Sequence, residues 1–258
     1  MSTAIPQTWY MTQRHLMVFA RQPAYAVITL VQPVIWLFVF GSLFKKVVGL
    51  GGFGTGSYLD YLVPGVVVMS ALSANLWAGM GTLEEIQRGT LDRFLTTPVG
   101  RGALMNGNVI SSSLVTALQS VVIVLLGLLG GADYPGGVAG IAVLVVASML
   151  LGTVFGALSN ALGMLVRERE SIIGINTFLL LPLTFLSSAF MAPGQMPSWI
   201  RHAADFNPLD WAMVAGRSAL SADPDWSGVG IRAGALLALA VAAVWLSVRT
   251  FRSYQRSV

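Results

Sequence analysis

The chain has 258 residues, of which only 10% are charged and 55% are hydrophobic, and its mean hydropathy is +0.73. Soluble domains carry about 25% charged and 45–50% apolar residues, so this composition excludes a water-soluble fold and favours a chain that lies largely in lipid. The net charge of +4 comes from basic residues spread along the chain without a patch, which argues against nucleic-acid binding, and the lack of cysteine excludes disulfides and thiol chemistry.

Runs without charged residues predict six membrane-spanning helices, because a helix needs about 20 apolar residues to cross a bilayer. The first run is too long for a cleaved signal, and Lys45 and Lys46 follow it instead of a small-residue cleavage site, so we interpret it as a permanent span. The last run contains Arg232, which is close enough to the span end to extend toward the membrane surface. In chain order the six helices are expected at about residues 24–44, 61–83, 106–129, 140–165, 171–190 and 229–248.

A glycine-rich stretch, "GLGGFG" at residues 49–54, fits the G-x-G-x-x-G pattern of dinucleotide-binding loops. Such a loop needs a strand before it and a helix after it within a βαβ unit. Here it follows two lysines beyond the end of a predicted span. We therefore interpret it as a chance match in a connecting loop.

The segment 84–101, "EEIQRGTLDRFLTTPVGR", holds six of the 26 charged residues, between two uncharged runs. Glu84 and Arg88 are four residues apart in the favourable order for a helical ion pair. Three large apolar residues further on share the i, i+3, i+4 spacing of one helical face, which predicts a short amphipathic helix that needs a partner, either lipid headgroups or a protein. An ordinary interfacial loop remains the alternative. The apolar face consists of Leu91, Phe94 and Leu95.

Prolines and small residues lie inside the predicted spans. Pro33, Pro64 and Pro182 each remove a backbone donor and can kink a helix, in a moving gate or as static kinks. Gly152 and Gly156 form a G-x-x-x-G pair in the fourth span, which indicates close helix packing, more simply within the chain than between chains.

Five amides also fall inside the predicted spans. Most are expected to form hydrogen bonds between helices, and each could alternatively contact a substrate. They are Gln32, Asn75, Gln119, Asn160 and Asn176.

The stretch 191–228 is too long for an unstructured connection in a compact protein. It contains four prolines and three tryptophans, and tryptophan prefers the headgroup layer of a membrane. We expect this stretch to lie in the outer interface, with a plain surface loop as the alternative.

Orientation follows from the Lys and Arg residues in the short loops. With both termini on one side, that side carries ten basic residues and the other carries five, which predicts cytoplasmic termini and a cytoplasmic segment 84–101. The ten are Arg14, Arg21, Arg88, Arg93, Arg101, Arg167, Arg169, Arg249, Arg252 and Arg256, and the five are Lys45, Lys46, Arg201, Arg217 and Arg232.

The chain lacks the residues of an energy-coupling site. Ion-coupled carriers place ionisable residues inside the bilayer, yet none of the first five predicted spans has one near its middle. No G-x-x-x-x-G-K-[ST] loop is present, so an ATP-driven pump would need a separate ATPase. An intramembrane enzyme is a remote alternative, because His15 and His202 are expected on opposite membrane faces, which also argues against a metal site.

The motif "E-x-x-x-GTLDRFLTTPV" resembles the signature after the second span in membrane subunits of the ABC-type-2 exporter family, especially the daunorubicin-resistance type. In that family the segment is a coupling helix that sits in a groove of the nucleotide-binding subunit. Phe94 stands where the family usually has a large aliphatic residue. The matching positions are Glu84, Arg88, Gly89, Thr90, Leu91, Arg93, Leu95, Thr97 and Pro98.

The resemblance extends over nearly the whole chain and implies further elements. An N-terminal interfacial elbow helix maps to about residues 6–22, and two short helices between the fifth and sixth spans, within 191–228, dip back into the outer leaflet. The family pairs two permease subunits, identical or paralogous, with two ATPase subunits that bind ATP and magnesium, so this chain is expected to hold no cofactor and no metal and to act in the plasma membrane as a permease, not an enzyme.

A cavity rich in Phe, Met and Leu without fixed charge suits a lipophilic drug or lipid-like substrate. The alternative is a sibling exporter of a polysaccharide, a lipid-linked carrier or haem. The residues predicted to line the substrate path are Gln32, Trp36, Phe38, Asn75, Trp77, Asn176 and Phe178.

Overall fold

The computed structural model describes residues 9–10, 12–13, 17, 23–43, 58–89, 101–189 and 193–254. Every regular element in these ranges is a helix, which confirms the all-α prediction. The elements are α2 (Pro23–Ile35), the π-helix η1 (Trp36–Phe40), α3 (Gly41–Leu43), α4 (Tyr58–Leu76), α5 (Ala78–Gln87), α7 (Arg101–Leu129), α8 (Gly137–Val166), α9 (Arg169–Phe185), the 3-10 helix η3 (Pro193–Gln195), α10 (Ser198–Asp205), α11 (Pro208–Leu220) and α12 (Trp226–Tyr254).

A helix lies at each of the six predicted span positions, but four regions in the described part of the chain are long and apolar enough to cross a membrane by themselves. Two are shorter: the apolar stretch Thr29–Leu43 and α9, which has 17 residues. The structure therefore supports four spans, and the count of six stays a prediction. The four regions are Tyr58–Gln87, Gly107–Leu129, Gly137–Val166 and Trp226–Phe251.

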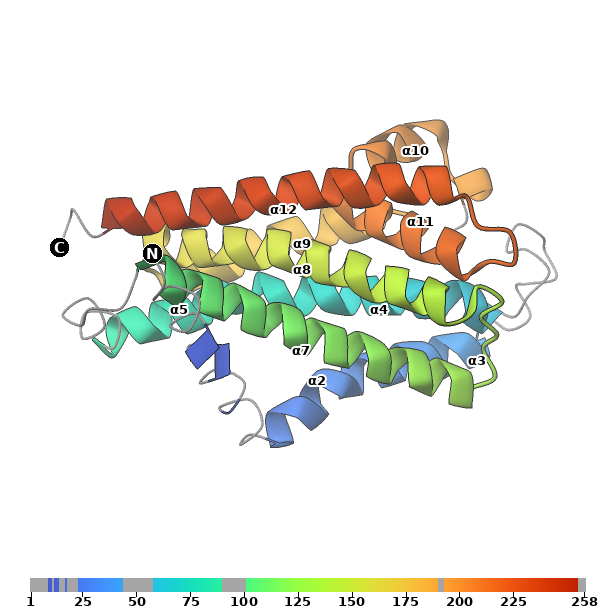
Figure 1. Cartoon of the computed structure of the whole chain (residues 1–258), viewed down its shortest axis with the longest axis horizontal. Helices are drawn as coiled ribbons and strands as arrows, with labels where there is room; N and C mark the ends of the chain where they lie inside the picture. Colours follow the sequence, from blue (N-terminus) through green and yellow to red (C-terminus); the bar gives the residue numbers. More distant parts are fainter. Residues whose placement is uncertain are drawn as a thin grey trace.

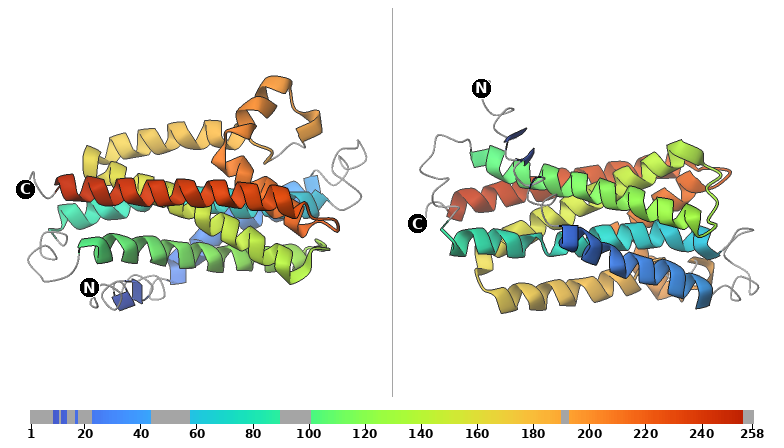
Figure 2. Two further views of the ribbon diagram at one scale, coloured as in Figure 1. Left: turned by 45° about the horizontal axis from the view of Figure 1, so that its top comes forward. Right: turned by 90° about the horizontal axis from the view of Figure 1, so that it is seen from below.

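The long helices lie roughly along one axis, so their termini gather at two ends of the bundle (Figures 1 and 2). One end, called here the Gln87 end, holds the last residues of α5, α8 and α12 and the first residues of α7 and α9. The opposite end, called the Leu43 end, holds the end of α3 and α7 and the start of α4, α8 and α12. This alternation of helix directions agrees with the predicted order of spans.

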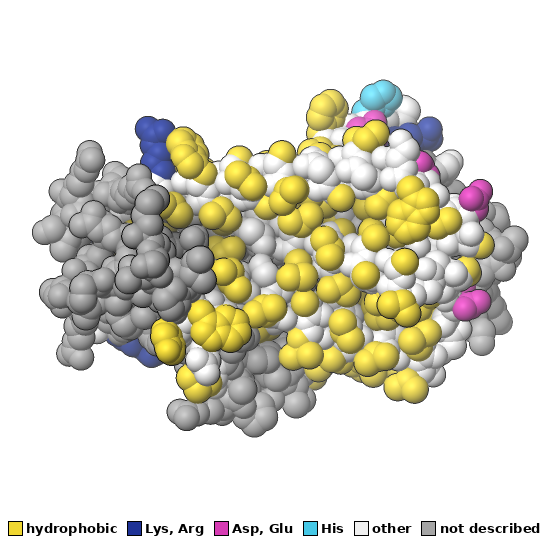
Figure 3. Space-filling view, viewed as in Figure 1, with side chains coloured by type: hydrophobic (Ala, Val, Ile, Leu, Met, Phe, Trp, Pro, Cys, Tyr) yellow, Lys and Arg dark blue, Asp and Glu magenta, His cyan; other side chains and the backbone are white. Residues whose placement is uncertain are grey.

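Charge and apolar side chains are separated on the surface in the same way. Figure 3 shows hydrophobic side chains over the middle of one face, while the coloured charged side chains lie toward its two ends. Leu237, Val241 and Trp245 of α12 are each more than half exposed. Such apolar exposure along a long helix is expected where lipid is the solvent.

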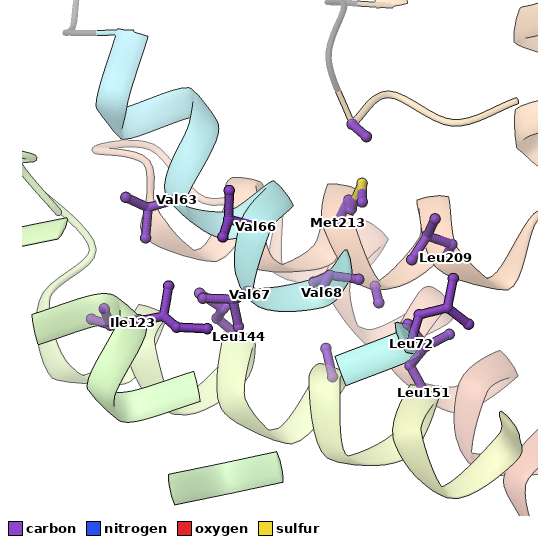
Figure 4. Packing of buried hydrophobic residues seen from close by; sticks show 14 of the residues in the cluster. Val63, Val66, Val67, Val68, Leu72, Ile123, Leu144, Leu151, Leu209 and Met213 are labelled. Carbon is purple, nitrogen blue, oxygen red and sulfur yellow. The ribbon is translucent and has the colours of Figure 1, made fainter. Parts of the chain in front are cut away.

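The core forms where α8 crosses the other helices. Valines of α4, with Leu72, interdigitate with Ile123 of α7, Leu144 and Leu151 of α8 and Met213 of α11 (Figure 4). Because lipid tails are as apolar as these side chains, dense van der Waals packing holds the helices together here.

Small residues on α8 allow it to approach α4 closely. A Cβ added at Gly152 would lie 2.7 Å from Asn75 Nδ2, and one added at Gly156 would lie 3.2 Å from Asn75 Oδ1. The G-x-x-x-G pair therefore packs within the chain, against α4, which confirms the intramolecular interpretation.

Proline affects the helices unequally. The π-helix η1 begins at Trp36, three residues after Pro33, whose missing N–H leaves the carbonyl of Thr29 without its usual bond within the helix. By contrast, α4 continues past Pro64 and α9 past Pro182 without a change of helix type. Among the three prolines, only Pro33 is followed by a local widening of the helix.

The helix α9 ends at Phe185, five residues before the predicted end of the fifth span. The carbonyls at its end accept hydrogen bonds from another part of the chain: Asn207 Nδ2 donates to Leu183 O and Leu186 O at 2.7 and 2.8 Å. The next turn is held by Asp210, whose Oδ1 accepts from Ser188 N at 2.7 Å. Residues just before and within α11 thus set this helix end, which local sequence did not reveal.

The Arg217 side chain joins three elements near the Leu43 end. Its Nη1 donates to Ser188 O and Oγ at 2.6 and 3.0 Å, its Nη2 to Ala189 O at 3.2 Å and its Nε to Tyr61 O at 3.2 Å. The guanidinium also lies 3.7 Å from the centre of the Tyr61 ring, and Tyr61 Oη donates to Ser188 O at 2.7 Å. We call these four residues the Arg217 clamp.

The loop that joins α7 and α8 is fixed at the same end. Tyr134 Oη donates to Val124 O at 3.3 Å, and Asp60 Oδ1 accepts from Asp133 N at 2.8 Å. Burial raises the pKa of the Tyr134 phenol, and the nearby Asp60 carboxylate raises it further, so Tyr134 stays neutral.

Two short helices, α10 and α11, occupy the predicted outer region 191–228. Their presence agrees with what the resemblance implied, and their depth relative to a membrane stays a prediction. Most of the predicted elbow at 6–22 lies outside the described residues. Those described are helical, and Thr12 contacts the start of α7, where its carbonyl accepts from Ser111 Oγ at 3.3 Å.

Candidate functional site: a helix break, two cavities and the coupling end

The second long apolar region is interrupted between α4 and α5. Trp77 leaves the α-helical ladder, and Met80 N instead donates to Trp77 O at 3.0 Å, a bond across three residues. Gly79 and Gly81 follow directly, and glycine weakens a helix by about 1 kcal/mol relative to alanine. We call this place, from Leu76 to Gly79, the Leu76 break.

Side chains from two other helices replace the bonds lost at the Leu76 break. Ser159 Oγ of α8 donates to Leu76 O and accepts from Gly79 N at 2.9 Å, and Asn176 Nδ2 of α9 donates to Leu76 O at 2.7 Å. Inside a membrane, freed backbone groups must find such partners. The break therefore connects α4, α5, α8 and α9 through polar contacts.

One polar atom beside the break is left over. Asn176 is 1% exposed, and its Oδ1 has no hydrogen-bond partner in the described part of the chain. A buried acceptor without a partner costs free energy, so such atoms are rare in folded proteins. In this arrangement of the helices, the side-chain oxygen of Asn176 thus accepts no hydrogen bond from the described residues.

A second polar contact lies on each side of the break. Asn75 Nδ2 donates to Thr116 Oγ1 of α7 at 2.9 Å, and Thr82 Oγ1 donates to Asn160 Oδ1 of α8 at 2.9 Å. Gln119 Nε2 of α7 donates to Thr29 O of α2 at 3.4 Å. All of the predicted buried amides but Gln32 thus form bonds between helices, which confirms the main expectation for them.

A cavity of about 340 Å³ lies between α4–α5 and α7, and we call it the polar groove. Trp77, Gly81 and Glu85 stand on the α4–α5 wall, toward the Gln87 end. The groove is unusually polar for a cavity between apolar helices. Its amides and hydroxyls are Asn75, Asn108, Gln119, Ser111, Ser112 and Thr116.

A smaller cavity of about 240 Å³, called the apolar pocket, lies between α2–η1, α4 and α9. Trp36 and Met69 contribute apolar surface from two of these elements, and Leu180 and Phe185 contribute it from α9. Gln32 is the amide on its wall. The lining fits the expected wall of apolar side chains without fixed charge.

The predicted substrate-path residues separate into three groups. Gln32 and Trp36 line the apolar pocket, and Asn75 and Trp77 line the polar groove. Asn176 is buried at the Leu76 break. The other two lie on the surface: Phe38 is 45% exposed and Phe178 is 74% exposed. The structure therefore does not bring all seven together, and their role in a substrate path stays a prediction.

The first residues of the predicted coupling segment form an ion-pair cluster at the Gln87 end. Glu84 Oε2 lies 3.5 Å from Arg88 Nη2, which confirms the predicted pair within the helix. Glu84 Oε1 also lies 3.1 Å from Arg169 Nη2, at the start of α9. The helix then ends, and Gly89 has a φ of +64°, a conformation that glycine adopts without strain. The remaining coupling residues, which lie outside the described residues, are Thr90, Leu91, Arg93, Phe94, Leu95, Thr97 and Pro98.

Comparison with known proteins agrees with this architecture. The family model described as "ABC-2 type transporter" matches residues 6–220. The chain belongs to the ABC-2 type transporter family. It is thus a multi-pass membrane permease subunit of an ABC transporter, a class that works with an ABC ATPase subunit.

Curated relatives of this permease cover most of the chain. It is 30% identical over 256 residues to the daunorubicin resistance ABC transporter permease protein DrrB1 of Streptomyces coeruleorubidus, which covers 98% of this chain and 88% of the relative. It is 27% identical to a transport permease, ycf38, of Porphyra purpurea over 84% of this chain and 74% of the relative. The ycf38 protein of Cyanophora paradoxa is 26% identical, over 81% and 72% of the two chains.

Several residues of the permease's site were missed by sequence reasoning. Ser159 and Arg169 were not singled out, although each contacts the α4–α5 region from more than 75 residues away. Serine is common in membrane helices, so Ser159 did not stand out. An arginine that follows a predicted span is usually interpreted as a marker of membrane orientation, as Arg169 was. Two sequence signals could have been used. The glycines at the break indicate an irregular backbone, and the serines of α7 indicate a polar face on that helix.

Proposed function

We propose that this permease is the membrane-spanning half of an ATP-driven exporter, which moves a lipophilic drug or lipid-like molecule from the cytoplasm or inner leaflet. Family membership and the name of the Streptomyces relative, a daunorubicin resistance permease, support this proposal. The apolar pocket supports it as well, because its lining fits a greasy substrate better than a sugar or an ion.

The observation that carries the proposal is the position of Glu84. It belongs to the segment expected to dock on the ATPase, and its carboxylate bridges Arg88 of that segment and Arg169 of α9. The same α9 helix reaches the Leu76 break through Asn176 and lines the apolar pocket through Leu180. A displacement of the segment would therefore act on α5 and α9 together.

In the proposed assembly two permease subunits stand side by side above two ATPase subunits. ATP and magnesium are bound by those ATPase subunits. Both termini and the segment 84–101 face the cytoplasm, so the Gln87 end, where α5 and α12 end, is the cytoplasmic end of the bundle. The membrane is the plasma membrane. The resemblance to the exporter family implies that the first and fifth spans form the contact between the two permeases. Phe38 and Phe178 lie on these two predicted spans and are exposed, so they are available for a second subunit.

The docking role is tested with the double variant Leu91→Asp/Phe94→Asp. Two charges on the predicted apolar face should abolish co-purification of the ATPase and ATP-dependent transport, because burying a carboxylate without a partner is strongly unfavourable. Leu129→Asp is the matched control, since Leu129 is 83% exposed and lies at the Leu43 end. This variant should leave co-purification of the ATPase and transport unchanged. Undiminished binding and transport in the double variant would refute the coupling role.

A further inference from the structure

The Leu76 break departs from a continuous helix by a small rotation. Trp77, at the break, has φ −86° and ψ −2°, whereas a regular α-helix has a ψ of about −42°. A rotation of about 40° around one backbone bond therefore separates the present arrangement of α4 and α5 from a single helix. A short 3-10 turn inside a longer helix often marks such a hinge. We call the present arrangement the interrupted form and the single helix the continuous form.

A serine of α8 stands inside the interrupted hydrogen-bond ladder. In the continuous form, Gly79 N and Met80 N would each donate to the carbonyl four residues earlier. Instead, Ser159 Oγ accepts from Gly79 N at 2.9 Å and donates to Leu76 O. Met80 N donates to Trp77 O at 3.0 Å. A side chain inserted into the ladder is a recognised cause of helix kinks, so Ser159 stabilises the interrupted form.

The unpartnered oxygen of Asn176 lies close to the Ser159 hydroxyl. The carbonyl of Leu76 can only accept, so the atom that Asn176 directs at it must be Nδ2, and Oδ1 is left over. Ser159 Oγ and Asn176 Nδ2 both reach this one carbonyl oxygen, so they lie at most two hydrogen-bond lengths, about 6 Å, apart. Once it releases the carbonyl, the Ser159 hydroxyl is therefore a donor within reach of the buried Asn176 Oδ1.

We propose that Ser159 and Asn176 are positioning residues that exchange hydrogen bonds as the permease passes between the two forms during transport. In the interrupted form, both side chains donate to Leu76 O. In the continuous form, Leu76 O accepts from Met80 N and from Asn176 Nδ2, because a carbonyl oxygen has two lone pairs. Ser159 Oγ then donates to Asn176 Oδ1, which gives the unpartnered acceptor its bond. Only the link of this exchange to ATP rests on the proposed function.

The exchange moves the far end of α5. This helix has ten residues, which makes it about 15 Å long, so a change of about 20° in its direction moves Gln87 by about 5 Å. Near that end, Glu84 contacts Arg169 of α9 through an exposed ion pair, which can rearrange at low cost. The same helix forms part of one wall of the polar groove. The two forms therefore differ both at the Gln87 end and in the width of the groove.

The test measures distances between spin labels in lipid nanodiscs by double electron–electron resonance. The chain has no cysteine, so labels can be attached at chosen positions. Gln87→Cys labels the end of α5, and it is paired in separate samples with Val241→Cys of α12 and Leu118→Cys of α7, all at exposed positions. The permease is measured alone and in complex with its ATPase, with and without a non-hydrolysable ATP analogue. The analogue should add a second distance, shifted by about 5 Å in at least one pair.

Two variants should shift the populations in opposite directions. Ser159→Ala removes two bonds from the interrupted form and one from the continuous form, so it should raise the continuous fraction about fivefold, even in the permease alone. Asn176→Leu removes a bond that only the continuous form makes, so it should lower the fraction that the analogue induces by a similar factor. The matched control is Ser148→Ala, because this buried serine of α8 donates to Leu144 O of its own helix at 2.8 Å. It should behave as the wild type does.

Shifts in the same direction for both variants, or shifts no larger than that of Ser148→Ala, would overturn the exchange, because a purely structural role does not act with opposite signs. If one variant does not fold, the other still decides the result against Ser148→Ala. The outcome is separable from that of the proposed function. The Ser159→Ala shift in the permease alone, with no effect of nucleotide in the complex, would retain the exchange and remove its link to ATP. Transport at the wild-type rate by both variants would retain the exporter and overturn the role of the exchange.

Discussion

The two ends of the bundle are held together in different ways. At the Leu43 end, the Arg217 clamp joins α4, α11 and the turn after α9 through four hydrogen bonds and a stacked ring. At the Gln87 end, α5 and α9 meet through Glu84 and Arg169, whose side chains are 44% and 52% exposed. Exposed ion pairs contribute only about 0–1 kcal/mol, whereas a bonded, partly buried guanidinium contributes more. The contact at the clamp is therefore firmly held, and the contact between α5 and α9 can rearrange at low cost.

The Leu76 break lies between these two ends. On one side of it, α4 packs densely against α8 and α11. On the other side, α5 packs closely against α8, where Leu83 is 1% exposed, but it meets α9 through the exposed ion pair of Glu84 and Arg169. Asn176, one bond short at the break, is suited to exchange partners if α5 moves. If the segment 84–101 is displaced by an ATPase, as proposed, we expect the break to rearrange more than the clamp does.

The largest effect on stability is expected from Arg217→Ala. The variant removes the hydrogen bonds that the guanidinium donates to Tyr61, Ser188 and Ala189, which should cost about 2–3 kcal/mol. Thermal unfolding in detergent measures this loss. Arg232→Ala is the control, because the bond of Arg232 within the described residues runs from Nη1 to Gly228 O of its own helix, at 3.2 Å. Equal, small shifts for both variants would show that the clamp does not fix the Leu43 end.

The next effect is expected from Gly79→Ala. The added Cβ would collide with the backbone of Ser159, which forces α5 away from α8 and should cost about 2 kcal/mol. Gly81→Ala, two residues further on, places its Cβ in open space and should be neutral or slightly stabilising. Comparing their unfolding temperatures isolates the contact at the break. If the two variants behave alike, the close approach of α5 and α8 does not matter.

The smallest effect on stability, combined with a clear effect on transport, is expected from charge reversal at Glu84. Glu84→Arg should change the unfolding free energy by less than about 1 kcal/mol, since both partners are exposed, but should lower ATP-driven transport several-fold. The double variant Glu84→Arg/Arg169→Glu should recover part of the transport. Arg249→Ala, at the same end but stacked on Trp245, is the control that should transport normally. No recovery in the double variant would argue against a direct role for this pair.

Most of the fold could be predicted from the sequence because a lipid environment restricts which helices can form. A helix in a membrane must be long and apolar, so the uncharged runs located the helices of the bundle. The largest differences are at the end of α12 (Tyr254 against 248), the start of α7 (Arg101 against 106) and the end of α9 (Phe185 against 190). That end depends on Asn207 and Asp210, which reach it from 21 and more residues away. Local patterns contain no such information.

The site was accessible only in part. Glu84 and Arg88 are one turn apart, so helical spacing predicted their contact. The contact of Glu84 with Arg169 and that of Asn176 with Leu76 span 85 and 100 residues, and they depend on how three helices pack. The amides were recognised as polar residues in apolar helices, but sequence could not tell which of them line a cavity and which are bonded at a break.

Transport by reconstituted vesicles tests the central claim most directly, that energy enters this permease through the segment 84–101 from an ATPase partner. Vesicles that contain the permease, the ATPase and ATP should accumulate a lipophilic substrate against its gradient. Vesicles with the permease alone should accumulate none, under a proton gradient, a sodium gradient or neither. Accumulation by the permease alone would contradict the account.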